Sequence, residues 1–257
     1  MKTDLAENKE VSWKLFGVDI FGTITSPKDA EVHSAVVFVA GSGPTDRNWC
    51  SPFLPGTNGS AELLAEALAA QGFVTLRYDK VASGPHVKEN IPKLLGKISM
   101  QSHIEELKGA VETIIAEKNV NKDNLFVLTN SEGAIHAVNY QLQAKSGRFK
   151  GLVLTGAPGR AIGDLGRSQI FDQIMHLPNA EIIMKPYDIA IADLLASKPI
   201  EIDASLPEGI KMLLRSLESP ANLPFSRELW TYKLSEFIAK IDDLTLVVIG
   251  KKDIQVD

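Results

Sequence analysis

The sequence contains a single cysteine, Cys50, so no disulfide can form within the chain. This usage is typical of a reducing compartment. A nucleophilic role for Cys50 is disfavoured, because no base lies near it in the sequence. The N-terminal segment is polar and charged, and no apolar run approaches the length of about 18 residues that a membrane span needs. We therefore expect a cytoplasmic protein without a membrane anchor.

Basic residues are also few, with 27 Lys and Arg against 32 Asp and Glu, and the formal net charge is -5. Nucleic-acid-binding domains usually carry a basic face, so no nucleic-acid partner is expected. Neither GxxxxGK[ST] nor GxGxxG follows a predicted strand, which disfavours a phosphate-binding loop. No HExxH motif or cluster of His, Cys and Asp indicates a metal site. We expect no cofactor and no metal, and a small molecule as the partner.

Hydrophobic residues make up 44% of the 257 residues, enough for a sizeable core. The pattern at 11–25 is typical of one or two antiparallel strands at a sheet edge. Further along, short apolar runs alternate with segments of helical spacing. The expected strands are 34–40, 73–78, 125–128 and 152–155, and the expected helices are 60–71, with Ser60 as its cap, 101–118 and about 134–143. This alternation predicts a mostly parallel sheet with helices on both faces.

The rhythm changes between residues 160 and 240, where helical patterns and prolines occur without a convincing strand. The apolar run 244–249, LTLVVI, then predicts another buried strand. We interpret 160–240 as a helical cap inserted into one α/β domain. The core of that domain would comprise residues 1–159 and 241–257.

The most informative local motif is LTNSEGA, residues 128–134, between a predicted strand and a predicted helix. A serine on such a turn projects its hydroxyl above the carboxyl ends of the strands, and the helix N-terminus favours a developing oxyanion. Ser131 therefore becomes a candidate nucleophile. Thr129 occupies the first glycine position of the usual Gly-x-Ser-x-Gly pattern, where packing is tight. The alternative is that Ser131 only caps the following helix.

Two further turns carry candidate groups. Residues 41–46, GSGPTD, follow the first central strand, and their glycines allow backbone N–H groups to face an oxyanion. An ordinary Gly-Pro turn is the alternative. Asp253 follows the last predicted strand, where a carboxylate can orient a histidine, or can be a solvated loop residue. The order of a serine and then an acid matches that of α/β-hydrolases.

Taken together, these segments resemble the α/β-hydrolase superfamily, more narrowly its bacterial esterases and peptidase-like hydrolases with a helical lid. The segments are AGSGPTDRNW (40–49), LRYDKVASG (76–84), LTNSEGA (128–134), LTGAPGR (154–160) and VVIGKKDIQVD (247–257). One family loop often reads Arg-Tyr-Asp-x-Arg-Gly. Val81 and Ala82 replace its last two residues here, so a different loop shape is expected.

The resemblance implies a role for each candidate. Ser131 would be the nucleophile, and the backbone N–H groups of Glu132 and Ser42 would form the oxyanion hole, with Gly43 as an alternative to Ser42. Asp253 would be the catalytic acid, and Asp257 a weaker candidate. The implied fold is an α/β-hydrolase fold with a helical cap.

The histidine of this family follows one more strand beyond the acid, whereas the sequence ends four residues after Asp253. We expect the sequence to be part of a longer chain; a split gene product or a loss of catalysis are the alternatives. Among the five histidines, His136 is expected to face away from Ser131, His33 lies at the wrong end of its strand, and His103 is expected on a helix surface. His86 and His176 are the two that could approach the pocket.

The predicted function is hydrolysis of small carboxylic esters through an acyl-enzyme on Ser131. One alternative is an aminopeptidase or amide hydrolase of the same fold, in which Glu132, Asp188 or Asp193 would bind the substrate amine. The other is a truncated, non-catalytic, hydrolase-like binding protein.

Overall fold

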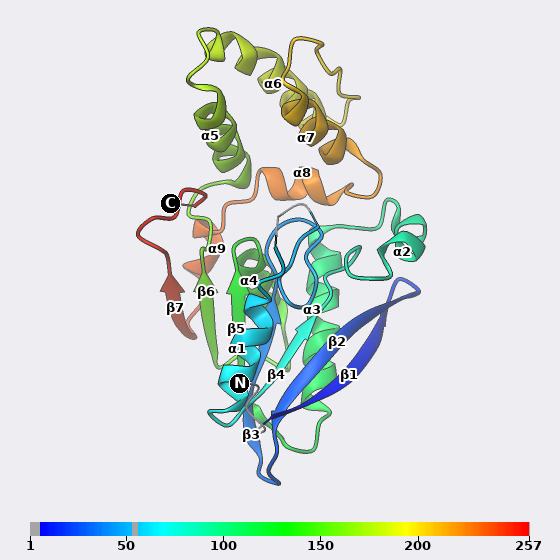
Figure 1. Ribbon diagram of the computed structural model, residues 1–257, viewed down its shortest axis with the longest axis vertical. Helices are drawn as coiled ribbons and strands as arrows, with labels where there is room; N and C mark the ends of the chain where they lie inside the picture. The colour runs from blue at the N-terminus through cyan, green and yellow to red at the C-terminus, as the bar shows by residue number, and fades with distance from the viewer. Residues whose placement is uncertain (1–5, 53–55, 257) are drawn as a thin grey trace.

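The computed structural model describes residues 6–52 and 56–256, and a seven-stranded sheet with the order β1-β2-β4-β3-β5-β6-β7 runs through this part (Figure 1). Its strands are β1 (Ala6–Leu15), β2 (Val18–Pro27), β3 (His33–Val39), β4 (Phe73–Tyr78), β5 (Val120–Asn130), β6 (Gly151–Thr155) and β7 (Leu244–Val248). The first two strands pair antiparallel, as do β2 and β4, while all pairs from β4 to β7 are parallel. The predicted mostly parallel sheet is confirmed.

Alternating side chains of β3 show how the two faces are covered. Ala35 and Val37 belong to the apolar cluster that includes α3 (Met100–Ile115) and α4 (Gly133–Gln143), whereas Val36 and Phe38 pack with α1 (Ser60–Ala69). A strand apolar at every position is therefore buried on both faces, as a parallel sheet requires. A further helix, α2 (Val87–Leu94), lies in the connection between β4 and α3.

The cap predicted for α1 is wrong. The residue before this helix is Gly59, with a left-handed φ of 57°, and no side chain caps the helix end. Glycine adopts that backbone conformation without a Cβ clash, so the turn is made by the backbone and Ser60 is already helical.

The predicted burial of the last strand is also wrong. β7 forms one edge of the sheet and every one of its residues is exposed, with Leu244 at 75% and Leu246 at 57%. Within residues 6–52 and 56–256, β7 pairs with β6 alone. The apolar composition of this run is typical of a buried strand, but no element of the described chain covers it.

Residues 160–240 form five helices: α5 (Ile162–Ile174), α6 (Ala180–Leu195), α7 (Glu208–Glu218), α8 (Phe225–Trp230) and α9 (Ser235–Ile238). The first three gather above the carboxyl ends of the parallel strands, with α8 between them and the sheet (Figure 1). They enclose their own apolar cluster, which includes Met184, Tyr187 and Leu194. No helix in the described ranges combines the length and the apolar character that a bilayer crossing needs.

Candidate active site

Ser131 lies on the sharp turn between β5 and α4 with a left-handed φ of 50°. Its N–H donates to the carbonyl of Thr155 at 2.8 Å, which ties the turn to the end of β6. The structure gives the Ser131 hydroxyl no hydrogen-bond partner among the described residues, and the residue preceding the helix is Glu132. Ser131 is therefore not a helix-capping serine. Left-handed backbone is costly for a residue with a Cβ, and such strain is concentrated at functional sites.

Small residues allow this turn to form. A Cβ built on Gly133 would lie 2.5 Å from the carbonyl oxygen of Val39 and 2.7 Å from that of Ala40, so only glycine fits there. Thr129 tolerates the tight packing expected at its position. It is fully buried within β5, and its hydroxyl donates to the carbonyl of Val153 at 3.3 Å. A threonine therefore substitutes for glycine at no cost in unpaired polar groups.

The loop after β3 lies against this turn. A Cβ built on Gly41 would be 3.3 Å from the Cβ of Ser131, which places Gly41 directly beside the serine. The Thr45 hydroxyl donates to the Ser42 carbonyl at 3.1 Å and holds the loop. Within residues 6–52 and 56–256, no acceptor takes the backbone N–H of Ser42 or of Glu132. Two backbone donors without an acceptor thus lie in the two segments next to the serine, and an oxyanion hole is built from donors of this kind.

Asp253 follows β7, at the same carboxyl ends of the parallel strands at which Ser131 follows β5. One of its carboxylate oxygens, Oδ1, accepts from the N–H groups of Gln255 at 2.9 Å and Val256 at 3.2 Å. The other, Oδ2, is 3.8 Å from the place where a Cβ on Gly156 would stand, and Gly156 directly follows β6. Oδ2 accepts no hydrogen bond in the described part of the chain and is free for another donor. Asp257, the second acid candidate, lies outside the described residues.

None of the five histidines is hydrogen-bonded to Ser131 in the described structure. His33 pairs with Asp29 at 2.6 Å at the amino end of β3. His86 is tilted over Phe21 with ring centroids 4.6 Å apart, and His176 is exposed between α5 and α6. The remaining two, His103 and His136, lie in a buried cluster next to Glu132, the residue that follows the serine.

That cluster is centred on Lys80, which lies two residues after the end of β4 and directly follows Asp79. The Lys80 ammonium donates to Glu132 Oε1 at 2.6 Å and to the carbonyl of Gly41 at 3.0 Å. His136 Nε2 donates to the same Glu132 oxygen at 3.1 Å, and the ring of His103 stacks on that of His136 with centroids 4.3 Å apart. Placing His103 on a helix surface was wrong, because it is 2% exposed.

The charges of this cluster follow from burial and pairing. Burial acts to raise the pKa of Glu132, but the Lys80 charge and the His136 hydrogen bond outweigh it and hold that pKa well below its ordinary value. Burial lowers the pKa of His136 and, more strongly, that of His103. At neutral pH the cluster therefore contains one ion pair, Lys80 with Glu132, beside two neutral imidazoles.

Each of the three acids considered for binding a substrate amine lies near a basic side chain of this chain. The Glu132 carboxylate is buried in the ion pair with Lys80. Asp188 accepts from Arg167 at 2.8 Å. Asp193 lies 3.9 Å from the Lys198 ammonium, at the limit of an ion pair. The expectation that Glu132 would bind an amine stays a prediction. Its carboxylate pairs with Lys80 instead, a contact between residues 52 positions apart that no local pattern indicates.

Glu106 of α3 is a further buried acid, contacting the Val81 N–H and, at 3.2 Å, His103 Nδ1. Burial raises the pKa of Glu106 to about 8, from 4.5. Between these values the folded state binds more protons than the unfolded state, so stability should fall as the pH rises through this window. We expect Glu106→Gln to reduce this fall in the free energy of unfolding by a few kcal/mol over the whole window, since one pKa unit corresponds to about 1.4 kcal/mol. Urea denaturation from pH 5 to 9 measures it, with the exposed Glu105→Gln as control; equal slopes for wild type and Glu106→Gln would contradict the prediction.

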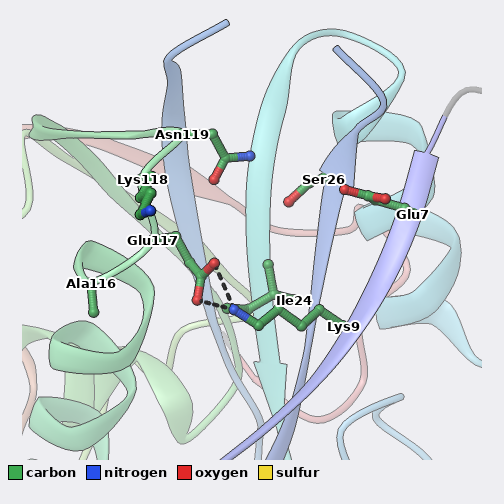
Figure 2. A pocket seen from close by; sticks show the side chains of 8 residues that line it. All are labelled: Glu7, Lys9, Ile24, Ser26, Ala116, Glu117, Lys118 and Asn119. Atoms are coloured by element: carbon green, nitrogen blue, oxygen red, sulfur yellow. Dashed lines mark hydrogen bonds and ion pairs between the residues drawn. The ribbon is translucent and has the colours of Figure 1, made fainter. Parts of the chain in front are cut away.

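A hollow of about 380 Å³ opens at the other end of the parallel strands, beside the point where β5 begins (Figure 2). Lys9 of β1 crosses it to Glu117 at 2.7 Å, and Asn119 borders it immediately before β5 begins. Ser131 follows the other end of β5, so this hollow is separate from the candidate active site.

No family model matches the chain, and no curated protein matches it. Solved structures do. The α/β hydrolase GrgF from Penicillium sp. sh18 superimposes with a TM-score of 0.59 and 14% identity over 98% of this chain and 82% of that chain. Proline iminopeptidase from Mycobacterium smegmatis gives 0.55 and 18% over 95% and 82%. The chain has the α/β-hydrolase fold. A third match, 2,6-dihydroxy-pseudo-oxynicotine hydrolase, has a TM-score of 0.53 and 14% identity over 94% of this chain and 52% of that chain. Because fold does not fix function, the activity must be argued from the site.

Proposed function

We propose that the chain is a serine hydrolase that cleaves small carboxylic esters through an acyl-enzyme on Ser131. The observation that carries the proposal is the strained turn, which holds Ser131 at a φ of 50° with its hydroxyl unpartnered, next to two segments that each carry an unused backbone donor. A turn of that shape costs stability, and a nucleophile at the carboxyl edge of an α/β-hydrolase sheet accounts for the cost.

Each group then has one task. The Ser131 oxygen attacks the ester carbonyl, and the N–H groups of Ser42 and Glu132 bind the oxyanion of the tetrahedral intermediate. The alcohol leaves with the proton taken from the serine, and water then releases the acid from the acyl-enzyme. A base must carry that proton, and Asp253 Oδ2 is free to orient an imidazole that does so. We assign this base to none of the histidines in the described ranges, because none contacts Ser131.

Esters are favoured over peptides by the state of Glu132. An aminopeptidase needs a carboxylate for the substrate amine, and the one beside the nucleophile is buried and neutralised by Lys80 at 2.6 Å. We expect p-nitrophenyl esters of short acids to be cleaved, and aminoacyl arylamides to be cleaved at least about 100-fold more slowly, a difference of roughly 2.7 kcal/mol. A panel of both substrate types, compared by kcat/KM, tests this. Faster cleavage of the arylamides would favour a peptidase, the activity named for one of the solved neighbours.

A non-catalytic binding protein is the second candidate. Its support is the lack of a histidine in contact with Ser131 in the described structure. Reaction with a fluorophosphonate separates the two candidates, because only an activated serine attacks phosphorus at an appreciable rate. Rapid labelling of Ser131 supports the hydrolase, and an inert Ser131 supports the binding protein.

A further inference from the structure

The ammonium of Lys80 contacts both segments that carry the unused donors. It donates to the Gly41 carbonyl at 3.0 Å on one side and to Glu132 Oε1 at 2.6 Å on the other. Lys80 is 7% exposed and Glu132 is 2% exposed, so water screens neither contact. One side chain therefore ties the loop after β3 to the turn that holds Ser131.

The Gly41 contact matters because of the peptide group to which it belongs. The carbonyl of Gly41 and the N–H of Ser42 are two ends of one planar unit, and in a trans peptide they point in opposite directions. A hydrogen bond from Lys80 to the carbonyl fixes the plane and therefore the direction of the Ser42 N–H. A cation at the oxygen also draws electron density from the nitrogen, which makes the N–H a stronger donor.

The Glu132 contact acts on the second donor. Glu132 supplies the other unused N–H, and its side chain is held by Lys80 and by His136 Nε2 at 3.1 Å. Since the side chain and the N–H share one Cα, a fixed carboxylate limits rotation of the residue that carries the donor.

We propose that Lys80 is a positioning residue that sets the two oxyanion donors, the N–H groups of Ser42 and Glu132, at their mutual geometry. This role rests on the proposed function. Lys80 touches neither substrate nor nucleophile and acts through the Gly41–Ser42 peptide and the Glu132 side chain. Because the oxyanion exists only after attack on the carbonyl, Lys80 should stabilise the transition state and leave ground-state binding unchanged.

The test compares kcat and KM for a p-nitrophenyl ester in Lys80→Met and in Lys80→Met/Glu132→Gln. The single variant leaves Glu132 buried without its cation, which endangers the fold. The double variant removes that charge and still leaves the Gly41 peptide untied. Lys9→Met, which breaks the exposed ion pair with Glu117 in Figure 2, is the matched control.

We expect kcat to fall by about 10²-fold in both Lys80 variants, the loss typical of a disabled oxyanion donor, with KM within about twofold of wild type. The control should match wild type in both constants. A folded double variant with wild-type kcat, or with a raised KM at unchanged kcat, would overturn the role, as would failure of both variants to fold, which would make Lys80 a purely structural residue. An inactive wild type would instead contradict the proposed function itself and, with it, this role.

Discussion

Replacing Ser131 by alanine is expected to lower the ester kcat by at least about 10³-fold, the scale of loss when a serine nucleophile is removed. The backbone donors of Ser42 and Glu132 remain in this variant, but no oxygen is left to form the acyl-enzyme. KM should change little, because the Ser131 hydroxyl acts in the attack on the ester and is not needed to bind it. Steady-state kinetics with a p-nitrophenyl ester measure both constants.

The fold should tolerate this change. The Ser131 hydroxyl makes no hydrogen bond in the described structure, so its removal should shift the free energy of unfolding by less than about 0.5 kcal/mol. Ser131→Gly should be equally inactive and more stable by about 1 kcal/mol, because glycine adopts a φ of 50° without strain. Ser197→Ala is a suitable control, because Ser197 is an exposed serine after α6 with a similar φ of 59°. Wild-type turnover by Ser131→Ala would remove Ser131 from the mechanism.

The second large effect is expected at Gly133. A methyl group on this residue would lie 2.5 Å from the carbonyl oxygen of Val39, the last residue of β3, and 2.7 Å from that of Ala40, which follows it. Backbone cannot rotate away as a side chain can, so α4 must move off the sheet. We expect Gly133→Ala to destabilise the fold by about 3 kcal/mol, at the upper end for overpacking, and to lower kcat because the turn at Ser131 shifts with the helix.

Gly209→Ala is the matched control for Gly133→Ala. Gly209 also lies in a helix, α7, and a Cβ there would have no atom within 4 Å. Alanine should therefore leave stability unchanged or raise it by up to about 1 kcal/mol. Chemical denaturation of both variants measures the difference. Equal stability of Gly133→Ala and Gly209→Ala would show that α4 is not in close contact with β3.

The parts of the fold that could be predicted are those with a local cause. The run at 34–40 is apolar at nearly every position because both faces of β3 are covered, and burial of this kind is visible in the sequence. The turn at Ser131 could be predicted because it needs a glycine, Gly133, where α4 packs closely against the end of β3, and that glycine is visible in the sequence. The edge position of β7 could not be found, because its residues are those of a buried strand and only the pairing shows what covers them.

The Lys80 cluster was missed for a different reason. Lys80 and Glu132 are 52 residues apart, and no local pattern links them. A weak signal was present in α3, where His103 and Glu106 are polar at helical spacing among apolar residues of the buried face. Polar residues on such a face need partners, so His103 and Glu106 together indicate a buried polar cluster against α3.

The proposed mechanism requires Ser131 to be the nucleophile, and mass spectrometry of the intact chain after reaction with a fluorophosphonate tests this most directly. Peptide mapping then locates the adduct. We predict one adduct per chain, on Ser131, and none in Ser131→Ala. An unmodified chain, or an adduct on another residue such as Cys50 with Ser131 unmodified, would contradict the account.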